Sequence, residues 1–172
     1  REYDDYDRKQ QGGALTVGHP LTFLGDELKD DYRFTLRYEL MNIDITNIDD
    51  DASQLVKDNE GNSVSSSVTP RLVRNTIDNP LDPENGSRQV ADIELAGVGG
   101  NEEFWLLGLA NTFYYPMAET SFGNFVFSQR TRLDYGRTYD GDDFPLFKRF
   151  FPGGINSVRG YDSRSLGPKD EE

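Results

Sequence analysis

The sequence predicts an all-β chain, an antiparallel up-and-down meander of about six strands. Apolar residues recur at every second position over long stretches, which is the spacing of a strand with one apolar face. No segment combines helix caps with a helical period, and the only helix candidate, residues 52–60, is short and acidic. The connections are rich in glycine, proline and asparagine, as expected for turns between antiparallel neighbours.

The strand predicted over residues 31–46 shows the alternation most clearly. One face is apolar and the other is mostly charged or polar: Tyr32, Phe34, Leu36, Tyr38 and Leu40 against Arg33, Thr35, Arg37, Glu39 and Met41. Residues 103–116 and 122–136 alternate similarly, and weaker patterns predict strands over residues 12–24, 66–78 and 87–97. Pro70 argues against a central position for residues 66–78, because proline lacks the N–H that a sheet ladder uses.

The lengths and positions of the connections suggest a strand-rich region followed by a long loop. Residues 47–65 form a long polar segment, whereas residues 79–86, NPLDPENG, have the composition of a turn. After residue 136 no further strand is predicted. We therefore expect a partial sheet over residues 1–136 and a long loop over residues 137–172.

Composition narrows the class of protein. The chain carries 31 acidic and 18 basic residues, a net charge of −13, without a basic patch, which argues against a nucleic-acid partner. It contains no cysteine, so neither a disulfide framework nor a cysteine-based metal site is expected. No apolar run reaches the roughly 20 residues of a membrane-spanning helix, and the first residues show no signal-peptide core. A transmembrane β-barrel remains possible because its strands need only about 9–11 residues.

We find no pattern that indicates a catalytic, metal or cofactor site. His19 is the only histidine, and a catalytic role would require a nucleophile and an orienting carboxylate beside it. The glycine pair at residues 153–154 is not followed by the Lys-Ser/Thr of a phosphate loop. The acidic segment DNEGN, residues 58–62, lacks the spacing of a calcium-binding loop.

The alternating strands suit either a soluble β-sandwich or a membrane sheet. Two features favour the membrane sheet. Charges of both signs occupy mid-strand positions of the polar face, and aromatic residues stand near the ends of the apolar stripes, as in the aromatic girdles of membrane barrels. About six strands cannot close a transmembrane barrel, whose smallest bacterial examples have about eight. A membrane sheet of this size is therefore a piece of a larger barrel, or it associates through its edges.

Two segments resemble motifs of the BamA-type outer-membrane assembly-factor family. FFPGGINSVRGYDSRSLGP resembles the family's sixth extracellular loop, whose hallmark here is Val158, Arg159, Gly160 and Tyr161, with Gly153 and Gly154 upstream and Gly167 and Pro168 downstream. RNTIDNPLDPENGS looks like the family's strand and periplasmic turn motif, carried here by Arg74, Asp78, Pro83 and Gly86. Three predicted strands separate the two motifs, which is the spacing that the family shows.

The resemblance implies a transmembrane barrel of about sixteen strands, of which this chain would supply the sixth to eleventh and the sixth loop. It implies a protein of the cell outer membrane that is not an enzyme and that folds and inserts other β-barrels. Its partners would be outer-membrane lipid, unfolded client proteins and accessory lipoproteins bound through other domains. Two alternatives stay open: a two-partner secretion or related translocation pore of the same superfamily, and a soluble all-β binding module. The NPLDP turn and the Gly-Pro after the loop motif favour the assembly factor.

The resemblance also assigns a role to Arg159. In the family this loop folds back into the barrel, where the arginine reaches acidic residues of the inner wall; a guanidinium can hold a carboxylate with two hydrogen bonds. The family's acidic partners lie on later strands. In this chain Arg159 would be unpaired or would use Asp134, Asp92 or Glu94. Gly160 would permit a tight turn, and Tyr161 would pack the loop.

Overall fold

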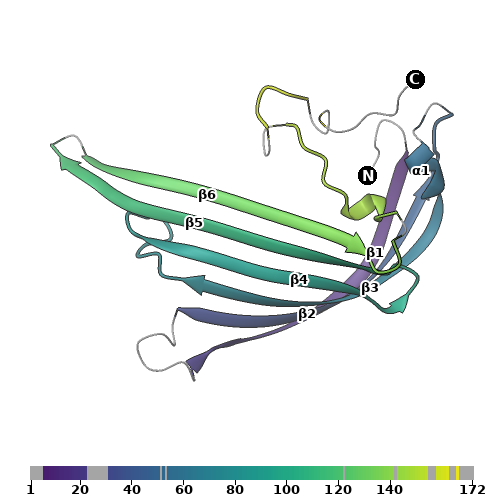
Figure 1. Cartoon of the computed structure of the whole chain (residues 1–172), viewed down its shortest axis with the longest axis horizontal. Helices are drawn as coiled ribbons and strands as arrows, with labels where there is room; N and C mark the ends of the chain where they lie inside the picture. Colours follow the sequence, from purple (N-terminus) through teal and green to yellow (C-terminus); the bar gives the residue numbers. More distant parts are fainter. Residues whose placement is uncertain are drawn as a thin grey trace. The chain divides into compact units, whose positions relative to one another are not determined.

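The computed structural model describes residues 6–22, 31–50, 52, 54–121, 123–141, 143–154, 158–162 and 166. Its elements follow one another along the chain (Figure 1): β1 (Asp7–Pro20), β2 (Tyr32–Thr46), α1 (Gln54–Asp58), β3 (Gly61–Asn75), β4 (Gly86–Gly100), β5 (Phe104–Thr120), β6 (Gly123–Thr138) and the 3-10 helix η2 (Leu146–Lys148).

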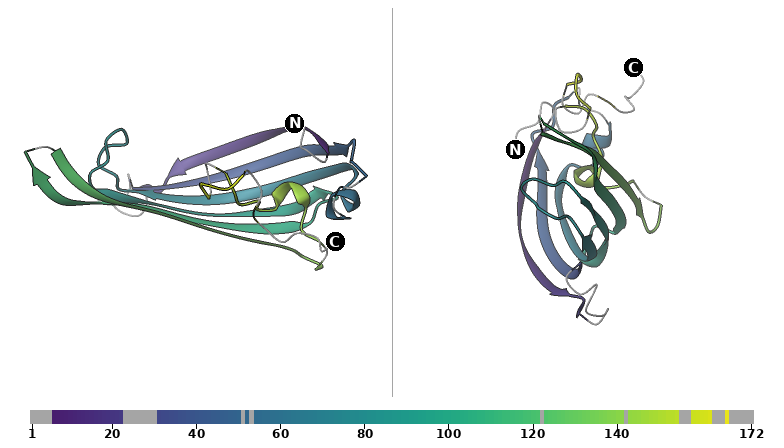
Figure 2. Two further views of the ribbon diagram at one scale, coloured as in Figure 1. Left: turned by 90° about the horizontal axis from the view of Figure 1, so that it is seen from above. Right: turned by 90° about the vertical axis from the view of Figure 1, so that its left-hand side faces the viewer.

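The six strands form one sheet in chain order, β1-β2-β3-β4-β5-β6, as the two further views also show (Figure 2). The pairs β3–β4, β4–β5 and β5–β6 are antiparallel, with Arg71 opposite Asp92 and Leu109 opposite Leu133. This confirms the predicted fold class, an all-β antiparallel meander.

Several strands are longer than predicted. β3 begins at Gly61 rather than residue 66, and β5 continues to Thr120 rather than residue 116. The extension of β5 passes Pro116 through a register shift before Ala118, which lets the pairing with β6 resume after the proline. The objection to a central strand at Pro70 is wrong, because β3 lies between β2 and β4. Pro70 removes one N–H there, while Val68 and Arg71 on either side keep their partners in β4.

Two compact units make up the chain. The first, which we call the sheet unit, comprises residues 11–42 and 63–142. The second, the loop unit, comprises residues 1–10, 43–62 and 143–172.

The loop unit has a small apolar core. Its buried residues come from all three of its segments: Tyr6, Ile43, Ile45, Ala52, Val56 and Leu146. α1 confirms the helix candidate, although it covers only Gln54–Asp58. So short a helix is unstable in isolation. Its tertiary support includes a hydrogen bond from the Leu146 N–H to the Asn59 side chain, just after the helix, at 3.4 Å.

Candidate functional site

One face of the sheet unit carries large apolar side chains that remain exposed. Leu15, Val17 and Leu133 are 68%, 65% and 64% exposed. Further exposed members alternate along the strands: Phe34, Leu36, Tyr38, Leu40, Leu72, Leu95, Leu109, Phe113, Tyr115, Phe125, Phe127 and Tyr135. A soluble sandwich buries such a face against a second sheet, and so large an apolar surface marks contact with a membrane or another protein. We call it the apolar face.

None of the helices in the described part of the chain is long and apolar enough to cross a membrane.

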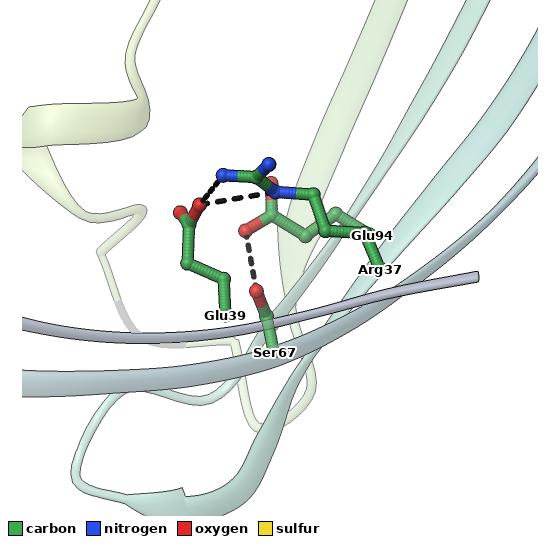
Figure 3. Close-up of polar contacts among 4 residues, drawn as sticks. All are labelled: Arg37, Glu39, Ser67 and Glu94. Carbon is green, nitrogen blue, oxygen red and sulfur yellow. Dashed lines mark hydrogen bonds and ion pairs between the residues drawn. The ribbon is translucent and has the colours of Figure 1, made fainter. Parts of the chain in front are cut away.

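The opposite face, which we call the polar face, carries charges that pair with one another. Arg37 Nε donates to Glu39 Oε2 at 3.1 Å, and Ser67 Oγ donates to Glu94 Oε1 at 2.9 Å. Figure 3 shows these four side chains. The same face holds ion pairs between Arg71 and Asp92, with 3.9 Å from Nε to Oδ1, and between Arg132 and Asp134, with 2.7 Å from Nε to Oδ2. Paired charges of both signs suit a water-filled barrel interior, as the alternating sequence pattern predicts.

Gly108 gives these carboxylates room. It lies in register between Asp92 on β4 and Asp134 on β6. A Cβ atom added to Gly108 would stand 2.7 Å from Asp92 Oδ2 and 3.3 Å from Asp134 Oδ1. The carboxylates of Asp92 and Asp134 therefore occupy the space beside Gly108 from the two neighbouring strands. The sequence pattern did not predict this role for Gly108.

The apolar face is interrupted by one row of polar side chains, which we call the polar ladder: Arg74, Gln89, Asn111, Gln129 and Thr131. Arg74 Nη1 donates to Gln89 Oε1 at 3.5 Å, and Gln89 Nε2 donates to Asn111 Oδ1 at 3.0 Å. Asn111 Nδ2 then donates to Gln129 Oε1 at 3.3 Å, and Gln129 contacts Thr131. The ladder thus crosses four strands with every donation directed away from Arg74.

Sequence reasoning missed the polar ladder. Its signal was present as breaks in the apolar alternation, one each on β3, β4 and β5 and two on β6. Only the register of the strands, with Arg74 opposite Gln89 and Gln89 opposite Asn111, places these breaks in a row.

The connection between β3 and β4 is built around Asp78. Its Oδ1 accepts the backbone N–H of Asn79 at 2.8 Å and of Glu84 at 3.3 Å. The N–H of Asn79 is the main cause that lowers the pKa of Asp78. Gly86 closes the connection with φ 103°, and a Cβ atom there would lie 2.1 Å from the Thr76 carbonyl oxygen. Pro83 lies within this connection.

The four residues of the predicted strand and turn motif therefore do not form one site. Asp78 and Gly86 shape the connection, whereas Arg74 lies on β3 and heads the polar ladder.

The loop motif folds back on itself within the loop unit. The Gly154 N–H donates to the Tyr161 carbonyl at 3.1 Å, and the Leu166 N–H donates to the Pro152 carbonyl at 3.2 Å. The first bond joins the glycine pair to the segment that carries Val158 and Tyr161, and the second joins the residues on either side of that segment. Gly153, Gly154 and Gly160 have φ values of 115°, 93° and 90°, in the region that favours glycine. Gly167 and Pro168 lie outside the described residues.

Arg159 is exposed and forms no ion pair with the described residues of its own unit. Val158 and Tyr161 are exposed too, at 38% and 56%. The three carboxylates considered for Arg159 all have partners on the sheet: Asp92 pairs with Arg71, Asp134 with Arg132, and Glu94 accepts from Ser67.

Among the described residues, no group of three or more histidine, cysteine, aspartate or glutamate side chains could hold a metal ion.

Known proteins resemble this chain in sequence and in fold. An outer membrane protein assembly factor BamA from Nitratidesulfovibrio vulgaris is 33% identical over the whole chain, and one from Neorickettsia risticii is 30% identical over 84% of it. The chain covers 21% and 19% of these two proteins, about a fifth of their length.

The fold matches a solved structure, BamA from Haemophilus ducreyi lacking POTRA domains 1–3. The TM-score is 0.76 at 20% identity, over 95% of this chain and 32% of that one. The meander therefore has the fold of part of a BamA barrel. The family model of the Omp85 superfamily domain matches residues 1–172, so the chain belongs to the Omp85 superfamily.

Proposed function

We propose that this chain is part of the transmembrane barrel of an outer-membrane protein assembly factor, which folds β-barrel proteins and inserts them into the outer membrane. In this proposal, residues 1–136 supply barrel strands and residues 137–172 supply a long extracellular loop. The complete protein would bind outer-membrane lipid, unfolded β-barrel clients and accessory lipoproteins. The proposal assigns no catalytic step to the described residues.

The exposed apolar face is the observation that carries the proposal. A sheet with exposed leucine, phenylalanine and valine on one face and paired charges on the other matches a barrel wall between lipid and a wet interior. The names of the relatives, which are assembly factors, favour barrel assembly over the translocation pore. The same apolar exposure speaks against a soluble binding module.

A reconstitution of the full-length protein that carries this chain tests the proposal. The protein is placed in lipid vesicles, an unfolded β-barrel client is added outside, and client folding is followed by its shift in electrophoretic mobility without heating. We expect faster client folding than in empty vesicles. Passage of a secreted client into the vesicle interior, with no acceleration of barrel folding, would instead indicate the translocation pore.

The proposal includes Arg159 as a positioning residue of the loop. Because its described surroundings contain no ion-pair partner, its carboxylates would come from other parts of the complete protein. We expect Arg159→Ala to lower client folding several-fold in the reconstituted protein. Arg159→Lys should restore little of it, since an ammonium cannot hold a carboxylate with a planar fork. Full activity of Arg159→Ala would refute the positioning role.

A further inference from the structure

A hollow of about 540 Å³ lies on the apolar face beside the polar ladder. Its lining includes Tyr32, Leu72, Arg74, Ala91 and Leu133. A second hollow of about 260 Å³ shares Leu72 and Ala91 with the first and is otherwise lined mainly by apolar residues of the same face: Phe34, Pro70, Ile93 and Leu107. The two hollows thus form one track that begins at Arg74 and continues over apolar side chains.

Arg74 differs from three arginines of the sheet that have carboxylate partners. Arg37, Arg71 and Arg132 each pair with a carboxylate on the polar face. Arg74 stands on the apolar face, and no described residue forms an ion pair with it.

The interactions that Arg74 does make leave it short of hydrogen bonds. Its guanidinium lies over the Tyr32 ring at 5.8 Å from the centroid and makes the long contact with Gln89. Its Nε is buried and has no hydrogen-bond partner. The guanidinium thus lines the hollow with a charge that no described residue neutralises, and an anionic acceptor from outside the chain would stabilise it.

The position of Arg74 indicates where such an acceptor comes from. Arg74 is the penultimate residue of β3 and stands beside Tyr32, the first residue of β2. Arginine and tyrosine at strand ends of a membrane sheet lie at the level of the lipid headgroups. The track runs from there toward the middle of the strands, which is the direction of an acyl chain.

We propose that Arg74 binds the phosphate of a membrane glycerophospholipid, one of whose acyl chains lies in the track over Leu72 and Ala91. The inference rests on the proposed placement of the apolar face in the membrane. An anionic phosphate in the hollow supplies the missing counter-charge and accepts hydrogen bonds from the terminal nitrogens of the guanidinium, whereas Nε is covered by the chain itself. Gln89 accepts a hydrogen bond from the guanidinium and donates its own amide N–H to Asn111. The ladder therefore orients Arg74 without competing for the phosphate.

Native mass spectrometry of the full-length protein tests the site. The protein, released from detergent micelles, is titrated with phosphatidylglycerol and separately with a diacylglycerol of the same acyl chains, which lacks the phosphate. We expect one tightly bound phosphatidylglycerol, with the diacylglycerol bound at least about tenfold more weakly. Arg74→Gln should weaken phosphatidylglycerol to the level of the diacylglycerol. Ala91→Trp, which fills the track and leaves Arg74 intact, should weaken both lipids.

Arg88→Gln is the matched control. Arg88 is exposed on β4, one residue before Gln89, and therefore lies on the polar face near the same depth. We expect it to bind phosphatidylglycerol as the parent does. Equal losses in Arg74→Gln and Arg88→Gln, or no loss in Arg74→Gln, would overturn the proposal. Displacement of the lipid by an equal concentration of inorganic phosphate would also overturn it, since the site would then recognise free phosphate.

The lipid site and the assembly function can be refuted separately. If Arg74→Gln binds lipid like the parent while the parent still folds clients, only the lipid site is wrong. If the parent binds lipid as expected and folds no client, only the assembly function is wrong.

Discussion

Gly86 shows how one residue shapes the connection between β3 and β4. Its φ of 103° is unfavourable for any side chain, and a Cβ atom would lie 2.1 Å from a backbone oxygen that cannot rotate away. We expect Gly86→Ala to lower the free energy of unfolding by about 1–3 kcal/mol, the range for a strained backbone. Urea unfolding of the full-length protein in micelles, followed by electrophoretic mobility, measures this change.

Gly13→Ala is the control for that substitution. A Cβ atom added to Gly13 would meet no atom within 4 Å, and its φ is not positive, so alanine should be tolerated without loss. Equal unfolding midpoints for the two variants would contradict the role given to Gly86.

Asp78 makes the same connection sensitive to acid. Its pKa is lowered from the ordinary value of 3.8, chiefly by the Asn79 N–H, so the folded state favours the ionised form. The stabilisation is therefore present above the ordinary pKa and is lost as pH falls through the lowered, folded value. We expect Asp78→Ala to destabilise the protein at pH 7 and to flatten the decline in stability below about pH 4. Parallel urea titrations at several pH values check this, and an unchanged acid limb would contradict it.

At the scale of the strand, two adjacent leucines of β5 test which face meets lipid. Leu107 lies on the apolar face, opposite Ile93 and Tyr135. Leu106 lies on the polar face, opposite Glu94 and Gly136. We expect Leu107→Arg to cost about 2–4 kcal/mol in a bilayer, as a charge facing hydrocarbon does. Leu106→Arg should cost much less, because it faces a carboxylate.

Unfolding of both variants in lipid bilayers measures the difference between the two leucines. Equal destabilisation would show that the apolar face does not meet lipid.

All six strands could be predicted because the alternation of apolar and polar residues is visible within each strand. It does not depend on how neighbouring strands pair. Their ends could not always be predicted. β3 starts within GNSVSS, where Ser65, Ser66 and Ser67 are buried and give no contrast between apolar and polar positions. A register shift between Ser65 and Ser67 obscures the period further.

The small core of the loop unit was not predicted, although β2 carries a sign of it. Its apolar residues stand at even numbers up to Leu40, and then Ile43 and Ile45 stand at odd numbers, both buried. This change of face indicates that something covers the other side of the strand there. The other buried residues of this unit include Val56 and Leu146, which come from separate stretches of the sequence, so only the tertiary structure places them in the same unit.

At the scale of the whole molecule, two parts of the sheet need contacts beyond those in the described residues. Its apolar face is exposed, and the outermost strands β1 and β6 each have one hydrogen-bonded neighbour in the described sheet. Within lipid, unpaired N–H and C=O groups at a sheet edge cost several kcal/mol each, on the order of 2–7. The rest of a barrel, or a second copy of the chain, would have to pair these edges.

The isolated 172-residue chain should therefore behave as a membrane sheet and not as a soluble domain. We expect circular dichroism to show β-sheet in detergent micelles and little cooperative structure in plain buffer, because water offers no cover for the apolar face. In micelles the open edges should favour association of copies, which light scattering detects as species larger than a monomer. Arg74→Gln and Gly13→Ala should leave this dependence on detergent unchanged, because neither substitution covers the apolar face. A monomer that unfolds cooperatively in buffer without detergent would contradict the membrane placement of the sheet, and with it the lipid site at Arg74.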